Sequence, residues 1–98
     1  MPALPPQDVS THLTALPGWQ VVNDELTRTF KFEDFSAALR FVNCVGDLAE
    51  AASHHPNIDI RYNKVTLKLT THDAGGLTAK DFGLAAAVDR LSSPAQVD

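Results

Sequence analysis

Three histidines and two acidic residues fall within one third of this 98-residue chain and have the chemistry for proton transfer. Glu50 precedes His54 by four residues, and His55, His72 and Asp81 follow. Imidazole has a reference pKa of about 6.5, so a histidine can donate or accept a proton at neutral pH. A carboxylate four residues before it on a helix shares its face and can orient the ring. The spacing therefore indicates a general acid–base site.

Each of these residues also has a structural interpretation. His54 and His55 have the form of a solvated helix end, and His72 that of an exposed residue at a strand end. Asp81 stands three residues after Thr78, which is the place of the acid in a capping box. Imidazole and carboxylate are also zinc ligands. We nevertheless expect no metal site, because two consecutive histidines at a breaking helix diverge.

Other classes of chemistry lack their motifs. The sequence contains no GxGxxG, P-loop, CxxC or HExxH pattern. Cys44 is the only cysteine and lies in an apolar helical stretch, so we expect it to be a small core residue. The net charge of −4 gives no electrostatic basis for direct nucleic-acid binding, and no apolar run is long enough to suggest a membrane span. We expect a cytoplasmic protein, because the first residues do not have the form of a targeting signal.

The elements that must position these residues can be identified from periodicity. Asp34 is a plausible N-cap for a long helix that Pro56 limits, and we expect it to end between His54 and His55. Leu26, Phe30 and Phe32 share one face of a strand that Arg28 interrupts. The pattern predicts helices at about 6–15, 34–53 and 78–91, and strands at 19–22, 25–32, 58–62 and 65–72.

The predicted order α-β-β-α-β-β-α indicates an α+β fold in two layers. We expect a four-stranded antiparallel sheet with the helices on one face. The length suits one domain over residues 1–98, and Pro94 would prevent much continuation of the last helix.

One segment carries a specific resemblance, and it reads EAASHHPNIDIRYNKVTLKLTTHDAGGLTAKD. It resembles the pterin-4a-carbinolamine dehydratase family, the dimerisation-cofactor proteins, in the acid four residues before HHP, the YNKV turn, the TH pair and the acid after Leu77 and Thr78. The Gly18-Trp19 entry to the first strand agrees as well.

The resemblance implies a hydro-lyase that dehydrates 4a-hydroxytetrahydrobiopterin to quinonoid dihydropterin, in tetrahydrobiopterin recycling after aromatic amino-acid hydroxylation. It implies that no cofactor is needed. It also implies the site residues: His54, His55 and His72 are catalytic, and Glu50, Pro56 and Asp81 lie beside them. Our hypothesis is that His54 and His72 exchange protons, that His55 binds and polarises the substrate, and that Glu50 and Asp81 orient imidazoles or pterin nitrogens.

A different class of function is also compatible with the resemblance. Family members can act as dimerisation partners of a transcription factor, so the alternative is a protein-binding regulator. The edges of a small antiparallel sheet also invite pairing between copies. We therefore expect a homodimer or homotetramer with a pterin substrate, and a functional link to an aromatic amino-acid hydroxylase.

Overall fold

The computed structural model describes residues 2–92. Four strands form one antiparallel sheet in the order β1-β2-β4-β3, and two long helices and one short helix accompany it. The elements are α1 (Pro6–Leu13), β1 (Gln20–Val22), β2 (Glu25–Lys31), α2 (Phe35–Ala52), β3 (Asn57–Arg61), β4 (Lys64–Leu69), the 3-10 turn η1 (His72–Ala74) and α3 (Ala79–Ser92). This arrangement confirms the predicted fold class, and the expected stop at Pro94 lies outside the described residues.

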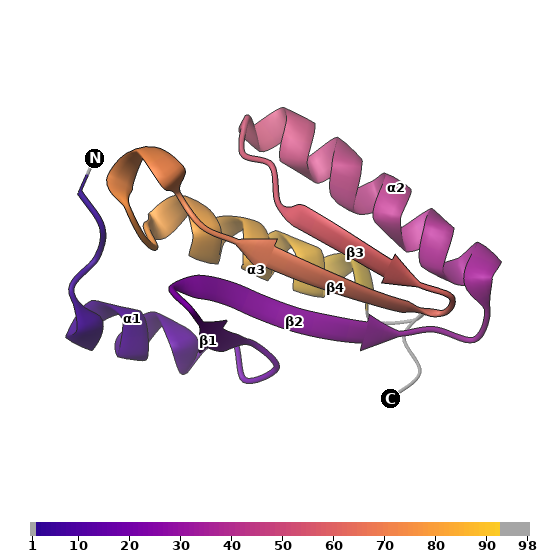
Figure 1. The fold of residues 1–98 in the computed structure, drawn as a ribbon, viewed down its shortest axis with the longest axis horizontal. Coiled ribbons are helices and arrows are strands. Elements are labelled where there is room, and N and C mark those ends of the chain that lie inside the picture. The colour runs from indigo at the N-terminus through magenta and orange to yellow at the C-terminus, as the bar shows by residue number, and fades with distance from the viewer. Residues whose placement is uncertain (1, 93–98) are drawn as a thin grey trace.

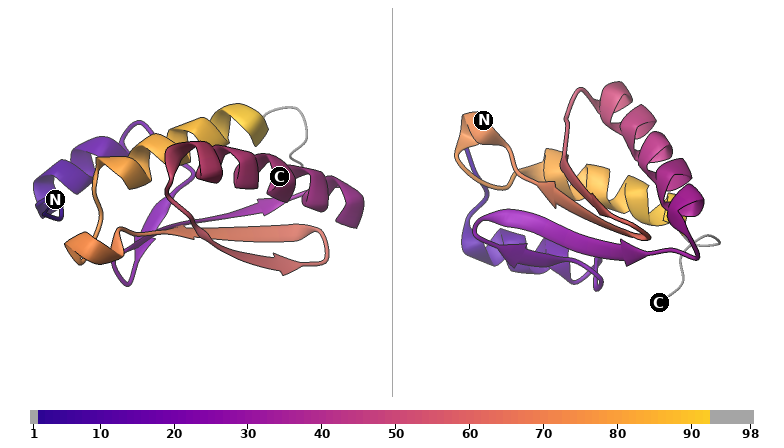
Figure 2. Two further views of the ribbon diagram at one scale, coloured as in Figure 1. Left: turned by 90° about the horizontal axis from the view of Figure 1, so that it is seen from above. Right: turned by 45° about the vertical axis from the view of Figure 1, so that its right-hand side comes forward.

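The helices lie on one face of the sheet, so the fold has two layers (Figures 1 and 2). The central strands β2 and β4 pair along their whole length, from Leu26 opposite Leu69 to Lys31 opposite Lys64. β3 extends the sheet beyond β4, with Ile58 opposite Leu67 and Ile60 opposite Val65. β3 and the short strand β1 are therefore the two edges.

Both hairpins turn tightly at residues with positive φ. Asn23 and Asp24 have φ values of 52° and 63°, which is the pattern of a type I′ turn between β1 and β2. The β3–β4 turn begins at Tyr62, one residue before the expected Asn63. Asn63 donates from Nδ2 to the carbonyl of Phe32 at 2.8 Å and so ties this turn to the end of β2.

The core lies between the sheet and the helices α2 and α3. Leu26 and Phe30 of β2 and Phe32 directly after it are buried, as their alternation predicts. Arg28, at the interrupted position, extends over the Phe30 ring and donates to Asp89 of α3 at 2.9 Å. Trp19 is buried and donates to the same carboxylate, so both side chains anchor α3 to the sheet.

Helix α2 begins as predicted and ends earlier than predicted. The Asp34 side chain accepts from the backbone N–H of Ala37 at 2.8 Å, as an N-cap does. The helix ends at Ala52 because Ser53 adopts a left-handed conformation, with φ 51° and ψ 40°. The prediction that it ends between His54 and His55 is therefore wrong, since both histidines follow the helix.

Two further expectations need correction. Cys44 is exposed, because the apolar stripe of α2 is wider than the surface that the sheet and α3 cover. β4 ends at Leu69 and does not extend to His72, although Thr71 forms an isolated bridge with Gly76. Among the described residues, no helix is long and apolar enough to cross a membrane.

Candidate active site

A cavity of about 320 Å³ opens where α2, β4 and α3 meet, at the end of the sheet that carries η1. Such a volume is at the lower end of the range for small-molecule sites. All three histidines of the predicted cluster line it. The full lining consists of Ser53, His54, His55, Thr70, Thr71, His72, Asp73 and Lys80.

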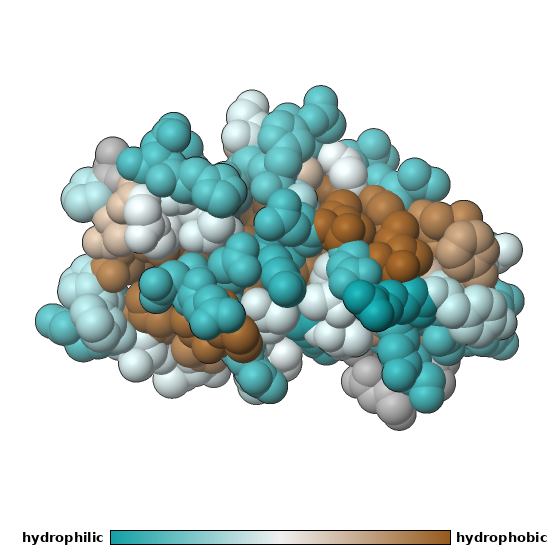
Figure 3. Space-filling view, viewed as in Figure 1, coloured by the Kyte–Doolittle hydropathy of each residue, from teal (hydrophilic) through white to brown (hydrophobic). Residues whose placement is uncertain are grey.

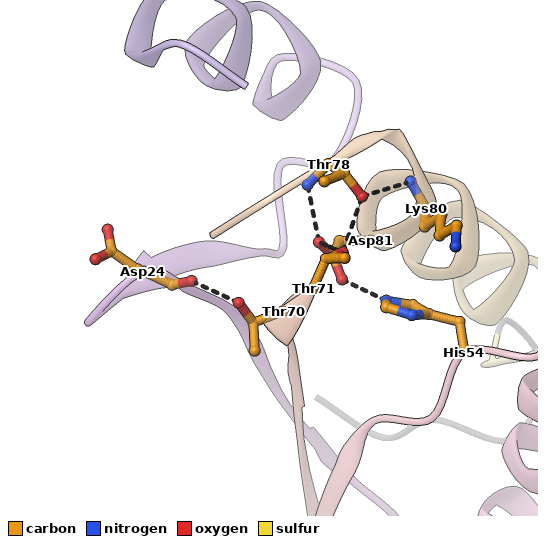
Figure 4. Close-up of polar contacts among 7 residues, drawn as sticks. All are labelled: Asp24, His54, Thr70, Thr71, Thr78, Lys80 and Asp81. Atoms are coloured by element: carbon orange, nitrogen blue, oxygen red, sulfur yellow. Dashed lines mark hydrogen bonds and ion pairs between the residues drawn. The ribbon is translucent and has the colours of Figure 1, made fainter. Parts of the chain in front are cut away.

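His54 is held by a buried carboxylate. Its Nε2 lies 2.6 Å from Oδ1 of Asp81, which is fully buried, and the His54 side chain is only 11% exposed (Figure 4). A charge without access to water is retained only with hydrogen-bond partners. Asp81 has them: its Oδ2 accepts from the Thr78 backbone N–H and from the Thr71 hydroxyl, each at 2.9 Å. No buried side-chain polar atom among the described residues lacks a partner.

The same carboxylate caps helix α3. Asp81 accepts from the backbone of Thr78, and the Thr78 hydroxyl accepts from the backbone N–H of Lys80 at 3.3 Å. This resembles a capping box with aspartate as the acid, except that the Thr78 hydroxyl accepts from the second helical residue and not from the third. The structural and the functional interpretation of Asp81 are therefore compatible, since one side chain begins α3 and holds His54.

His55 is held in a different environment. The αL residue Ser53 and the following Pro56 turn the chain, and the His55 ring points to Glu50, with which it forms a close Nε2–Oε2 hydrogen bond. Both side chains are well exposed, at 63% and 78%. Water weakens such a pair, so it orients the ring more than it stabilises the fold.

His72 lines the cavity from η1, the turn that follows β4. It is exposed, as are its cavity neighbours Asp73 and Lys80. The 3-10 turn ends at Gly75, whose φ of 74° is a conformation that favours glycine. Gly76 does not have a positive φ; a Cβ there would instead lie 3.1 Å from that of Ala3.

The structure brings three of the six predicted site residues, His54, His55 and His72, to the lining of this cavity. Glu50 does not line it and contacts His55, so the expectation that it shares a helix face with His54 is wrong. Asp81 lies behind His54, and Pro56 is partly buried outside the lining. Within residues 2–92, no three His, Cys, Asp or Glu side chains are grouped so that they could hold a metal ion.

Five lining residues were not among the predicted site residues, and one of them had a signal. They are Ser53, Thr70, Thr71, Asp73 and Lys80. Thr71 continues the odd-numbered positions Val65, Leu67 and Leu69, all of which are buried. A threonine at the next position of a buried face indicates a polar group directed inward. Lys80 and Thr70 carry no comparable signal in the sequence.

Comparison with known proteins agrees with the fold. The family of pterin 4 alpha carbinolamine dehydratase matches residues 2–91. A Chloroflexus aurantiacus protein named "Putative pterin-4-alpha-carbinolamine dehydratase" is 56% identical over 91 residues, covering 93% of this chain and 98% of its own. An Acidobacterium capsulatum protein with the same name is 52% identical, covering 93% of this chain and 99% of its own.

Solved structures show the same fold. A transcriptional coactivator/pterin dehydratase from Brucella melitensis superposes with a TM-score of 0.88 at 36% identity, over 92% of this chain and 98% of its own. A pterin dehydratase-like protein, described as a RuBisCO assembly factor of the alpha-carboxysome, has a TM-score of 0.62 at 25% identity. That alignment covers 76% of this chain and 86% of the other. The matches in sequence and fold together show that this chain belongs to the pterin 4 alpha carbinolamine dehydratase family.

Proposed function

We propose that this chain dehydrates 4a-hydroxytetrahydropterin to quinonoid dihydropterin by histidine general acid–base catalysis. The observation that carries this proposal is the lining of one cavity by three imidazoles, two of which are held by carboxylates. Membership in the family gives the pterin class of substrate. The cavity volume of about 320 Å³ suits a small bicyclic ring.

The reaction needs one proton donor and one proton acceptor. The C4a–oxygen bond breaks as the hydroxyl takes a proton and leaves as water, while the N5–H bond gives up its proton and its electrons form the C4a=N5 double bond. Two histidines that line one small cavity supply this pair of groups. General acid and base assistance of this kind contributes about 10² to 10⁴ in rate.

The geometry favours separate roles for the histidines. His54 and His72 line the cavity from two different segments, the residues after α2 and η1, so we assign them the proton transfers. His55, whose Nε2 is paired with Glu50, binds and polarises the substrate. Asp81 and Glu50 are assigned the orientation of His54 and His55, and Pro56 directs the chain out of α2.

The direct test is stopped-flow absorbance of freshly generated 4a-hydroxytetrahydropterin with and without the protein. Catalysis should appear as a protein-dependent acceleration that is proportional to protein concentration. An unchanged rate of dehydration at micromolar protein would rule the activity out. In a cell, this reaction would take place in the cytoplasm, downstream of an aromatic amino-acid hydroxylase that forms the carbinolamine.

We also propose that β3 pairs with β3 of a second copy. All five residues of this edge strand are exposed, and apolar side chains gather over β3 and the adjoining face of α2 (Figure 3). Ile58 and Ile60 lie opposite the buried Leu67 and Val65, so they point to the helix side. The exposed large apolar residues of this surface are Phe35, Leu39, Ile58, Ile60 and Tyr62.

Charge selects the register of that pairing. If β3 pairs antiparallel with its copy about Ile60, Asp59 lies opposite Arg61 of the second copy, and the reverse pair forms by symmetry. A shift to the next register in either direction places Asp59 opposite Asp59 or Arg61 opposite Arg61, and like charges there are unfavourable. The edge strand is thus self-complementary in one register, which supports a homodimer as the unit of any larger assembly.

The second candidate function is regulation of another protein through binding. The exposed apolar surface of α2 and β3 supports it, and the Brucella melitensis relative is described as a transcriptional coactivator as well as a pterin dehydratase. A binding surface does not require three histidines in one cavity. If substitution of these histidines leaves partner binding intact while it removes dehydration, the two functions use separate parts of the chain.

A further inference from the structure

We propose that Thr71 and Thr78 are positioning residues that fix the protonation of His54, so that His54 exchanges protons with the substrate through Nδ1. This inference rests on the proposed dehydratase function. The two threonines contact each other and both donate to Oδ2 of Asp81, so they connect it to the end of β4 and the start of α3 (Figure 4).

The direction of each hydrogen bond in this group can be assigned. The backbone N–H of Thr78 can only donate, and it donates to Asp81 Oδ2 at 2.9 Å. The Thr71 hydroxyl donates to the same oxygen at 2.9 Å. Because a hydroxyl has a single proton, the 2.8 Å contact between Thr71 Oγ1 and Thr78 Oγ1 must then be donated by Thr78.

The chain of donors continues to the helix backbone. With its own proton directed to Thr71, Thr78 Oγ1 accepts from the backbone N–H of Lys80 at 3.3 Å. The Lys80 N–H therefore donates a hydrogen bond to Thr78, the Thr78 hydroxyl donates to Thr71, and the Thr71 hydroxyl donates to Asp81. Every bond points toward the carboxylate, and donors in one such series polarise one another.

The direction of these hydrogen bonds determines which oxygen of Asp81 is available to His54. Asp81 Oδ2 accepts two hydrogen bonds on the threonine side, which leaves Oδ1 facing His54 Nε2 at 2.6 Å. Two donors on Oδ2, the Thr78 backbone N–H and the Thr71 hydroxyl, fit the ionised form of this carboxylate. An ionised carboxylate accepts and cannot donate, so Nε2 carries the hydrogen and Nδ1 is the nitrogen left for the substrate.

The positions of the two threonines suit this role. Thr71 forms the bridge to Gly76, and its carbonyl accepts from the backbone N–H of Ala74 at 3.0 Å, so its backbone is fixed at both ends of the turn. Thr78 is fully buried. A capping residue alone needs only contact with the helix backbone, whereas here the Thr71 hydroxyl donates to the carboxylate that holds His54, and the Thr78 hydroxyl donates to Thr71.

The experiment compares Thr71→Val, Thr71→Ser and the control Thr66→Val. Thr66 lies on β4, five residues before Thr71, and forms a 2.8 Å surface pair with Thr29 of β2 and no hydrogen bond with Asp81. In the unliganded protein, ¹⁵N NMR of the His54 ring should show hydrogen on Nε2 and none on Nδ1. In Thr71→Val, the Nε2–H signal should exchange faster with water, and kcat should fall about 10-fold with KM changed less than about 2-fold.

Thr71→Ser retains the hydroxyl and should restore both the signal and kcat, and Thr66→Val should leave both unchanged. A folded Thr71→Val protein with the wild-type Nε2–H signal and kcat would overturn the proposal. Hydrogen on Nδ1 in the wild-type protein would overturn it as well, and that measurement needs no variant. Absence of dehydration by the wild-type protein would refute the proposed function alone, since the ring protonation is measured without substrate.

Discussion

His54 Nε2 lies 2.6 Å from Asp81 Oδ1, and this contact joins the residue after α2 to the first turn of α3. The carboxylate is fully buried, so neither solvent nor another charged side chain among the described contacts competes for it. His55 differs, because its carboxylate partner Glu50 is exposed. Of the two adjacent histidines, the His54 ring is therefore fixed by a buried partner, whereas the His55 ring can move.

Single replacement of each cavity histidine should separate the proposed roles. His54→Ala and His72→Ala remove a proton-transfer group, so kcat should fall by about 10² to 10⁴. His55→Ala removes a binding contact and should raise KM more than it lowers kcat. Stopped-flow measurement of carbinolamine dehydration gives both constants.

His12→Ala is the matched control for these variants, because His12 stacks on Phe82 at a ring-centroid distance of 4.9 Å and does not line the cavity. It should retain wild-type kinetics. Near-wild-type turnover in all three cavity variants would refute the assignment of the histidines.

The two carboxylates should respond differently to amide replacement. Asp81→Asn keeps an oxygen for Thr71 and Thr78 but presents an NH₂ group to His54 Nε2, which forces the other ring tautomer. We expect kcat to fall about 100-fold or more, with a loss of about 1 kcal/mol in the free energy of unfolding. Urea denaturation and turnover measured on the same preparation check both effects.

Glu50→Gln should change the free energy of unfolding by less than about 1 kcal/mol, because the pair with His55 is exposed. Its effect should be confined to substrate binding through His55. A larger kinetic defect in Glu50→Gln than in Asp81→Asn would contradict the assignment of Asp81 as the group that orients a proton-transfer histidine.

The sequence predicts the elements well where local signals agree with the tertiary structure. Asp34 caps α2, and Thr78 with Asp81 begins α3, because both caps depend on contacts only a few residues apart. The buried face of β2 follows from strict alternation. The convergence of the three histidines was also accessible, since a hairpin returns the chain to the place where α2 ends.

The predictions that were wrong concern the exact end of α2 and the burial of Cys44, which the periodicity of apolar residues does not determine. Ser53 adopts the αL conformation, which ends α2 before His54. As a result Glu50 forms its hydrogen bond with His55 and not with His54. Cys44 was assigned to the core because it widens an apolar stripe, but the extent of burial depends on how α3 crosses α2. Sequence patterns predict which residues are apolar, and packing decides how many of them are covered.

Charge reversal on β3 tests the proposed pairing between copies. Arg61→Asp places Asp59 opposite an aspartate of the second copy, so the assembly should dissociate at micromolar protein. Asp59→Arg combined with Arg61→Asp restores opposite charges in the same register and should restore the assembly. Sedimentation analysis of the three proteins measures the mass; an Arg61→Asp protein with the wild-type mass would exclude this register.

Two glycines offer a test of the turn that carries His72. Gly75 has a φ of 74°, so Gly75→Ala should lower the free energy of unfolding by about 1 kcal/mol although no atom would contact the added Cβ. Gly46 lies in α2, where a Cβ would also have no atom near it. Gly46→Ala should therefore raise the free energy of unfolding by up to about 1 kcal/mol. Because the Gly75 N–H donates to the carbonyl of His72 at 3.1 Å, strain at Gly75 should also displace His72 and lower kcat, whereas Gly46→Ala should not. Urea denaturation and turnover together decide this: a loss of stability in Gly75→Ala without a kinetic defect would show that the conformation of η1 does not control the position of His72.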